Sequence, residues 1–138
     1  MIIAVDFDGT IVSSDRPYND IYSPLIFLPG AREGLRSLKR AGHTLVLWSG
    51  RTNRALIYNP EFDPLWVEGM PWPSDAARML HADRLRQMLR FVAEELPGVF
   101  DAIDDGRQGK LEADLYIDDR GIGADINWKA IAATYGEL

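Results

Sequence analysis

Apolar residues occur in four short runs between polar stretches, and this spacing predicts a buried sheet. Ile2–Val5 is apolar throughout, as expected of a parallel strand that is covered on both faces. His43–Trp48 predicts a second strand, Val99–Ile103 a third and Leu115–Ile117 a fourth. The pattern therefore predicts a sheet of four strands.

Longer segments with apolar residues at helical spacing separate and follow these strands. The first predicted helix starts at Pro29-Gly30 and stops at Gly42, the second covers His81–Leu96, and the third covers Trp128–Tyr135. The order is strand, helix, strand, helix, strand, strand, helix. This alternation predicts an α/β fold, a Rossmann-like open parallel sheet with helices on both faces.

The length of 138 residues is typical of one domain, so residues 1–138 are expected to form a single unit. Two stretches lack a clear period. Residues 13–29 are expected to be a loop. Residues 59–74 form a Pro- and Trp-rich insertion with four prolines and two tryptophans, which is interpreted as a lid, a base-stacking surface, a subunit contact or a small satellite core.

Composition narrows the range of functions. The net charge is −6, which disfavours a broad electrostatic grip on nucleic acid, and a local basic patch stays open. There is no cysteine, so neither a disulfide framework nor thiolate chemistry is expected. No apolar run approaches the roughly 20 residues of a membrane span, and the N-terminus lacks the pattern of a signal peptide. We therefore expect a cytoplasmic protein without a membrane partner.

Acidic and hydroxyl residues follow the predicted strands, where open parallel sheets bind their ligands. In chain order they are Asp6, Asp8, Ser49, Asp104, Asp105, Asp118 and Asp119. Several carboxylates this close cannot all stay ionised without a compensating charge. Mg²⁺ prefers oxygen ligands and often lies between carboxylates and a substrate phosphate. The strand ends therefore predict a magnesium site that also holds a phosphate.

Each acidic pair also has a simpler interpretation. Asp6 and Asp8 are two residues apart, so their side chains leave an extended chain on the same side, but the pair also fits a capped turn. Asp118 and Asp119 also fit a solvated loop with a surface ion pair. The pair after the third strand is interpreted as a polar loop, at the rim of the site at most. Placement of the other two pairs at strand ends favours one shared site.

Four elements, in this order, resemble the motifs of the haloacid dehalogenase (HAD) superfamily, most of whose members are Mg²⁺-dependent phosphohydrolases. The run D-F-D-G-T, residues 6–10, resembles the first motif, and Ser49 resembles the second. Lys110 resembles the third motif, and Asp118-Asp119 resembles the acidic pair of the fourth. The resemblance spans about residues 1–128, and residues 109–120 are similar to a set of small predicted phosphatases in this superfamily.

This resemblance implies a role for each residue. Asp6 would be the nucleophile that forms an aspartyl-phosphate, and Asp8 would be the general acid and base. Lys110 would offset the charge of the nucleophile and the transferring phosphoryl group. The Asp6 carboxylate, the main-chain carbonyl of Asp8 and the pair Asp118 and Asp119 would bind Mg²⁺. The division of labour within that last pair stays open.

Three neighbouring residues are candidates for phosphate binding. The resemblance implies that Ser49 donates a hydrogen bond to a phosphoryl oxygen. Main-chain N–H groups at the Gly50 turn can cradle the same group. Arg51 matches phosphate oxygens with its planar guanidinium, and a salt bridge to the acidic edge is an equally good interpretation of this residue.

The chain has little room for a cap over the site. Residues 11–29 are too few for a folded cap domain and allow only a small flap. Tyr18, Tyr22 and Phe27 in this flap either line the site or pack the loop onto the core. A core with a minimal cap or none has an open site, which suits a large substrate or closure by a second subunit of a homo-oligomer.

The leading hypothesis is a Mg²⁺-dependent phosphatase, a phosphomonoester hydrolase whose phosphorylated substrate is left open. A phosphotransferase would share the first step on Asp6. A non-catalytic phosphate- or metal-binding module on the same fold belongs to a different class, since fold alone does not prove activity. A phosphoacceptor switch of the receiver type fits less well, because its acidic pair and its acceptor follow the strands in a different order.

Overall fold

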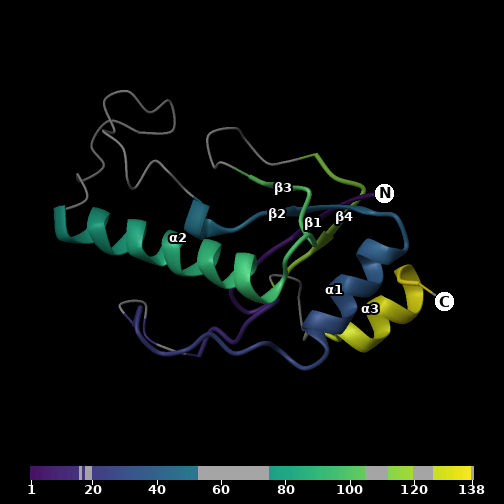
Figure 1. The fold of residues 1–138 in the computed structure, drawn as a ribbon, viewed down its shortest axis with the longest axis horizontal. Helices are drawn as coiled ribbons and strands as arrows, with labels where there is room; N and C mark the ends of the chain where they lie inside the picture. Colours follow the sequence, from purple (N-terminus) through teal and green to yellow (C-terminus); the bar gives the residue numbers. More distant parts are fainter. Residues whose placement is uncertain (16, 18–19, 53–74, 105–111, 120–125, 138) are drawn as a thin grey trace.

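The structure is a computed structural model that describes residues 1–15, 17, 20–52, 75–104, 112–119 and 126–137. Its sheet has four parallel strands in the order β3-β2-β1-β4 (Figure 1). The strands are β1 (Ile2–Val5), β2 (Thr44–Leu47), β3 (Ala102–Ile103) and β4 (Leu115–Ile117). All four predicted strands are therefore present. β3 begins three residues later than predicted, because the chain is still in a turn at Val99.

Within the described ranges, three α-helices and one short 3-10 helix accompany the strands. They are α1 (Ala31–Arg40), η1 (Gly50–Thr52), α2 (Asp75–Glu95) and α3 (Trp128–Tyr135). The predicted start of the second helix at His81 is wrong, since α2 begins six residues earlier in a stretch with little apolar spacing. In the described parts of the chain, none of the helices has the length and apolar composition that a membrane span requires.

The boundaries of α1 follow from two glycines. Gly30 precedes the helix with a φ of 76°, and Gly42 follows it with a φ of 91°. Both values lie in the left-handed region, which glycine enters without a steric penalty. Leu35 and Leu38 are fully buried on the inner face, and the last turn is basic, as the helix dipole favours. The predicted amphipathic helix is confirmed here.

One hydrophobic core joins the sheet to all three α-helices. Its strand residues are Ile3, Val5, Leu45, Leu47 and Ile117, and its helix residues include Leu35, Leu38, Met88, Val92, Leu96 and Trp128. Successive side chains of a strand point to opposite faces, so the strand residues of this core share one face of the sheet. The predicted α/β fold with an open parallel sheet is confirmed, with the described helices gathered on that face.

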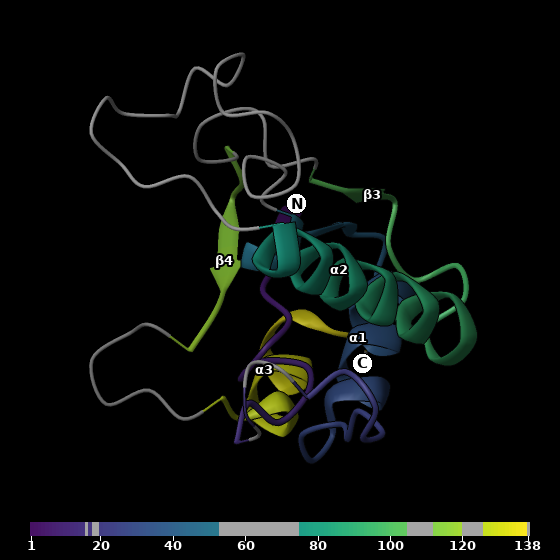
Figure 2. The same cartoon turned by 90° about the vertical axis from the view of Figure 1, so that its left-hand side faces the viewer.

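The direction of the chain explains why these helices share a face. β1, β2 and β3 follow one another across the sheet in one direction, and the right-handed crossovers of parallel units then place α1 and α2 on the same side. α3 lies beside α1 in Figures 1 and 2, and Trp128 contacts Gly34. The described helices therefore lie on one face of the sheet, whereas the sequence predicted helices on both faces. On the other face of the described sheet, Trp48 meets Tyr116 edge-on, with ring centroids 5.8 Å apart.

A short flap leaves the sheet after β1. Val12 pairs with Phe27 in an antiparallel bridge, so the residues between them form the small flap that the sequence predicts. Phe27 also packs against Phe91 of α2, with ring centroids 4.8 Å apart, and therefore holds the flap on the core. Tyr22 is 90% exposed and does not pack on the core, while Tyr18 lies outside the described residues.

Candidate active site

Asp6 and Asp118 follow two neighbouring strands at the same edge of the sheet. Val5 of β1 is the register partner of Ile117 of β4, and the Asp6 N–H donates to the Ile117 carbonyl at 3.0 Å. Both strands are parallel, so the residues after them emerge side by side. β4 lies on the opposite side of β1 from β2, so the strand order reverses at β1, which is where open α/β sheets bind ligands.

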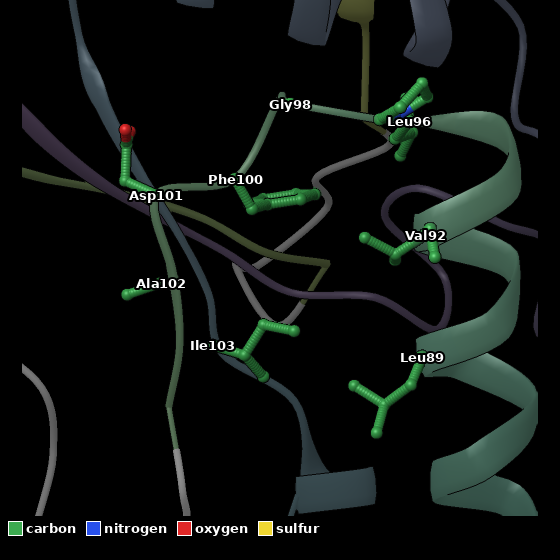
Figure 3. A pocket seen from close by; sticks show the side chains of 10 residues that line it. Leu89, Val92, Leu96, Gly98, Phe100, Asp101, Ala102 and Ile103 are labelled. Carbon is green, nitrogen blue, oxygen red and sulfur yellow. The ribbon is translucent and has the colours of Figure 1, made fainter.

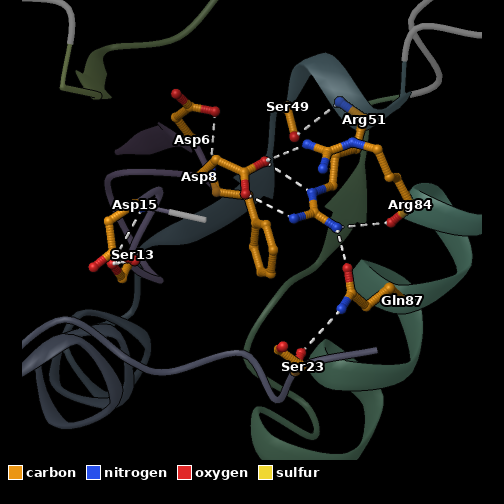
Figure 4. A network of polar contacts seen from close by, with 10 residues as sticks. Asp6, Asp8, Ser13, Asp15, Ser23, Ser49, Arg51, Arg84 and Gln87 are labelled. Carbon is orange, nitrogen blue, oxygen red and sulfur yellow. Dashed lines mark hydrogen bonds and ion pairs between the residues drawn. The ribbon is translucent and has the colours of Figure 1, made fainter. Parts of the chain in front are cut away.

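The Asp6 side chain is held by the chain that follows it. Its Oδ1 accepts a hydrogen bond from the Phe7 main-chain N–H at 2.8 Å (Figure 4). Phe7 itself is fully buried in the core, so the strand end is anchored on one side while Asp6 stays partly exposed. A carboxylate at a rigid strand end is placed with little conformational freedom, which a nucleophile or a metal ligand requires.

Asp8 forms the best-defined polar contact of the site. Arg51 Nε donates to Asp8 Oδ2 at 2.8 Å, and Arg51 Nη2 donates to Oδ1 at 2.7 Å (Figure 4). This is the bidentate geometry that favours arginine over lysine. Arg84 of α2 adds a second cation, with its Nη2 3.8 Å from Asp8 Oδ2. Two cations therefore face the carboxylate of Asp8.

Arg51 itself is fixed from the helix side. Its side chain is 3% exposed, and its Nη1 donates both to the Gln87 Oε1 at 2.8 Å and to the Arg84 carbonyl at 3.0 Å. The guanidinium also lies over the ring of Phe7 at 5.2 Å from the centroid. Of the two interpretations that the sequence left open for Arg51, the structure shows the salt bridge. Its contact with a phosphate stays a prediction.

Ser49 follows β2 and begins the turn that carries Arg51. Its Oγ accepts a hydrogen bond from the Arg51 main-chain N–H at 3.1 Å, and its carbonyl accepts from the Thr52 hydroxyl at 2.7 Å. These bonds shape η1 and bury Ser49 to 8% exposure. A hydroxyl that accepts one bond still has its own hydrogen to donate. Gly50 is exposed, and nothing lies within 4 Å of the space where a Cβ would stand.

Asp119 lies directly against the loop that follows β1. A Cβ built on Gly9 would overlap the Oδ2 of Asp119, and the φ of Gly9 is 76°. Only glycine accepts both this backbone conformation and this close approach without strain. The fourth predicted motif therefore touches the first one through Asp119 and Gly9, in addition to the adjacency of Asp6 and Asp118.

The predicted magnesium ligands fit the ion in chemistry, without forming a ready-made cluster. In the described part of the chain, no three His, Cys, Asp or Glu side chains stand close enough to hold one metal ion. One reason is that the Asp8 carboxylate is turned to Arg51. The resemblance assigns the carbonyl of Asp8, not its carboxylate, to the metal, so this ion pair is compatible with it. The remaining donors, Asp6, Asp118 and Asp119, supply the carboxylate oxygens that Mg²⁺ prefers.

Several other predicted residues stand apart from this edge or lie outside the description. Asp105, Lys110 and residues 59–74 lie outside the described residues. Asp104 follows the edge strand β3, three strands from β4, or about 14 Å at the usual spacing between strands. Lys39 of α1 pairs with Asp101, which precedes β3.

The structure also shows two site residues that sequence reasoning missed. Arg84 and Gln87 reach the Asp8–Arg51 pair from α2. They are three residues apart and therefore share a helix face, next to the fully buried Met88. Polar residues at the border of an apolar helix face were the available signal, but the sequence offers nothing that pairs them with a partner in another element.

An apolar groove formed by described residues lies apart from this site. It has a volume of about 340 Å³ and lies between the second half of α2 and β3 (Figure 3). Its lining is mostly apolar and includes Leu89, Val92, Phe100 and Ile103. None of the predicted site residues lines it, so the candidate chemistry belongs to the edge of the sheet.

Comparison with known proteins bears on the fold. Neither a protein-family model nor a curated protein matches the sequence. A solved structure of a conserved protein from Bacteroides thetaiotaomicron is similar, with 29% sequence identity and a TM-score of 0.56. The alignment covers 95% of this chain and 85% of the other. The likeness supports the α/β class that the sheet topology defines.

Proposed function

We propose that this protein is a Mg²⁺-dependent phosphatase of the HAD type that works through an aspartyl-phosphate on Asp6. The observation that carries the proposal is the adjacency of Asp6 and Asp118, which the Val5–Ile117 pairing produces at the carboxyl edge of the sheet. Two aspartates that follow strands far apart in sequence lie side by side where α/β proteins bind phosphates. Ser49 follows the next strand on the other side of β1.

The proposed reaction has two steps. A carboxylate oxygen of Asp6 attacks phosphorus, a new P–O bond forms, and the bond to the leaving oxygen breaks while Asp8 gives that oxygen a proton. Water then attacks the phosphorus of the acyl phosphate and passes a proton to Asp8. Inorganic phosphate leaves, and both carboxyl groups return to their initial states.

The remaining residues bind and neutralise charge. Asp6, the carbonyl of Asp8 and Asp118, assisted by Asp119, are the residues that would hold Mg²⁺, which when bound lowers the electrostatic cost of bringing a phosphate dianion to carboxylates. The Ser49 hydroxyl donates to a phosphoryl oxygen, together with the main-chain N–H groups at Gly50. Lys110 adds a positive charge near the same group.

The substrate is a phosphomonoester that reaches an open site. Among the residues that the structure describes, the flap between Val12 and Phe27 lies beside β1, and it is too small to enclose a ligand as a folded cap does. A phosphotransferase remains the alternative enzyme, since an acceptor other than water would complete the second step. A phosphate-binding module without turnover is the alternative outside enzymes.

Phosphate release from a panel of phosphomonoesters tests the proposal. We expect release by the wild type in Mg²⁺, none in EDTA, and none from Asp6→Asn, which preserves the shape of the side chain but removes the nucleophile. Transfer of phosphate to an added alcohol without release would favour the phosphotransferase. Binding of phosphate and Mg²⁺ without any turnover would favour the binding module. Undiminished release from Asp6→Asn would contradict the assignment.

A further inference from the structure

A continuous chain of contacts runs from the flap to Asp8 through α2. The Gln87 Nε2 faces the Ser23 carbonyl of the flap at 3.5 Å, and the Gln87 Oε1 accepts from Arg51 Nη1 at 2.8 Å. Arg51 in turn holds both carboxylate oxygens of Asp8 (Figure 4). Gln87 therefore joins α2 to the candidate acid and base through Arg51, whereas Arg84 faces Asp8 directly.

We infer that Gln87 is a positioning residue for catalysis: it fixes the guanidinium plane of Arg51, and Arg51 fixes the carboxylate of Asp8. This inference rests on the proposed function, because it gives Gln87 a role in placing the group that the proposal names as acid and base. Gln87 touches no reacting atom. Its effect reaches Asp8 only through Arg51.

A guanidinium is planar, so a partner on Nη1 and two bonds from Nε and Nη2 determine its position and orientation together. Here the partners on Nη1 are the Gln87 amide and the Arg84 carbonyl, both on α2. Arg51 is 3% exposed, so little water is at hand to replace a lost partner. Loss of the Gln87 acceptor therefore leaves a buried N–H unsatisfied or lets the guanidinium shift.

The orientation of the Gln87 amide is set from both ends. Its oxygen faces the Arg51 donor, and its nitrogen faces the Ser23 carbonyl acceptor. If the amide were flipped, its N–H donors would face the Arg51 donor and its oxygen would face the Ser23 carbonyl, which also accepts. The short bond to Arg51 dominates, and the longer contact to Ser23 reinforces it. The flap thus supports the orientation in which Gln87 accepts from Arg51.

Leaving-group dependence separates positioning of an acid from a general loss of structure. An alkyl phosphate has a poor leaving group that needs a proton, whereas p-nitrophenyl phosphate has a good one that does not. For Gln87→Met, which keeps the volume but removes the acceptor, we expect kcat on the alkyl phosphate to fall roughly tenfold more than on p-nitrophenyl phosphate, with KM nearly unchanged. Asp8→Asn shifts the same ratio further in the same direction.

The control is Arg90→Met, which introduces the same side chain at an exposed position of α2. It should leave kcat on both substrates, and the ratio of the two kcat values, unchanged. An equal loss of kcat on both substrates in Gln87→Met would overturn the inference and leave the proposed phosphatase standing. If Gln87→Met left the kinetics unchanged while Asp8→Asn shifted the ratio of the two kcat values, the inference would likewise be overturned and the proposed phosphatase would stand.

A second measurement does not depend on turnover. Hydrogen exchange at the Arg51 Nε–H, followed by NMR, reports how firmly the guanidinium is held. We expect slow exchange in the wild type and in Arg90→Met, and exchange roughly tenfold faster in Gln87→Met, because the guanidinium loses one of its buried hydrogen-bond partners. Exchange that is the same in all three proteins would overturn the inference, even if no phosphatase activity were found.

Discussion

Arg51 holds both carboxylate oxygens of Asp8, at 2.8 Å from Nε to Oδ2 and at 2.7 Å from Nη2 to Oδ1. The two side chains differ in exposure, at 3% for Arg51 and 31% for Asp8. The Asp8 carboxylate is therefore hydrogen-bonded on its buried side and accessible on the side that faces the edge of the sheet. An acid and base needs this combination, because it must be placed firmly and still reach a proton on a bound ligand.

The first prediction concerns the two parallel hydrogen bonds from Arg51 to Asp8. Arg51→Lys keeps the positive charge but loses the planar fork, so at most one oxygen of Asp8 can be held. We expect the free energy of unfolding to fall by about 1–3 kcal/mol, because buried partners on α2 lose their donors. Urea denaturation measures this change. The matched control is Arg86→Lys, at an exposed pair with Asp83, where a loss of similar size would contradict the role of burial.

The second prediction tests the position of the proposed magnesium site. Asp118→Asn removes a carboxylate beside Asp6, so we expect Mg²⁺ affinity by calorimetry to weaken by more than about tenfold, a loss that even outer partners of metal ligands can cause. Asp104→Asn makes the same chemical change at the end of the edge strand β3 and should leave the affinity unchanged. Weakening by Asp104→Asn alone would place the metal elsewhere.

The third prediction separates the two demands on Gly9. Gly9→Ala and Gly98→Ala meet the same backbone penalty, since their φ values are 76° and 73°. Each should lower the free energy of unfolding by about 1–2 kcal/mol. Only Gly9→Ala also displaces the carboxylate of Asp119, so only this variant should lose Mg²⁺-dependent activity. Equal effects of the two variants on activity would show that the Asp119 contact is unimportant.

The fourth prediction concerns acid stability at the far end of the sheet. The hydrogen bond from Lys39, and then that from the Leu45 N–H, hold the pKa of Asp101 below its usual value. The unfolded chain keeps the ordinary pKa, so it binds this proton first as the pH falls. The stabilisation is therefore complete above the ordinary pKa and disappears as the pH falls through the lowered one.

Thermal unfolding of the wild type and Asp101→Asn over a pH series measures this contribution. We expect the wild type to be more stable at neutral pH and the difference to shrink below about pH 4, where the unfolded carboxyl is protonated. A difference that is independent of pH would mean that the ion pair with Lys39 contributes nothing to it.

Much of the edge of the sheet was predictable from the sequence. Apolar runs locate β1 and β4 at Ile2–Val5 and Leu115–Ile117, and α3 at Trp128–Tyr135, with the observed bounds. Once the strands are parallel, their carboxyl ends lie at one edge of the sheet, so the pattern places Asp6 and Asp118 at the same edge. That they lie side by side follows from the pairing of β1 with β4. β1 carries this information because three of its four side chains are buried, and such strands are apolar in sequence.

Other features depend on contacts that no local pattern contains. Asp8 selects Arg51 as its partner, and Gln87 joins that pair from a helix whose polar residues look alike in sequence. The gathering of α1 and α2 on one face follows from the strand order β3-β2-β1-β4, which the alternation of strands and helices does not specify. Tertiary packing decides these features.

The central claim is that Asp6 becomes phosphorylated, and trapping of the intermediate tests it most directly. Borohydride added during turnover of a phosphomonoester reduces an aspartyl-phosphate to homoserine, and peptide mass spectrometry then identifies the residue. We predict homoserine at position 6 in the wild type when Mg²⁺ is present, and none in EDTA or in Asp6→Asn. Homoserine at another aspartate, or turnover with no trapped residue at position 6, would contradict the account.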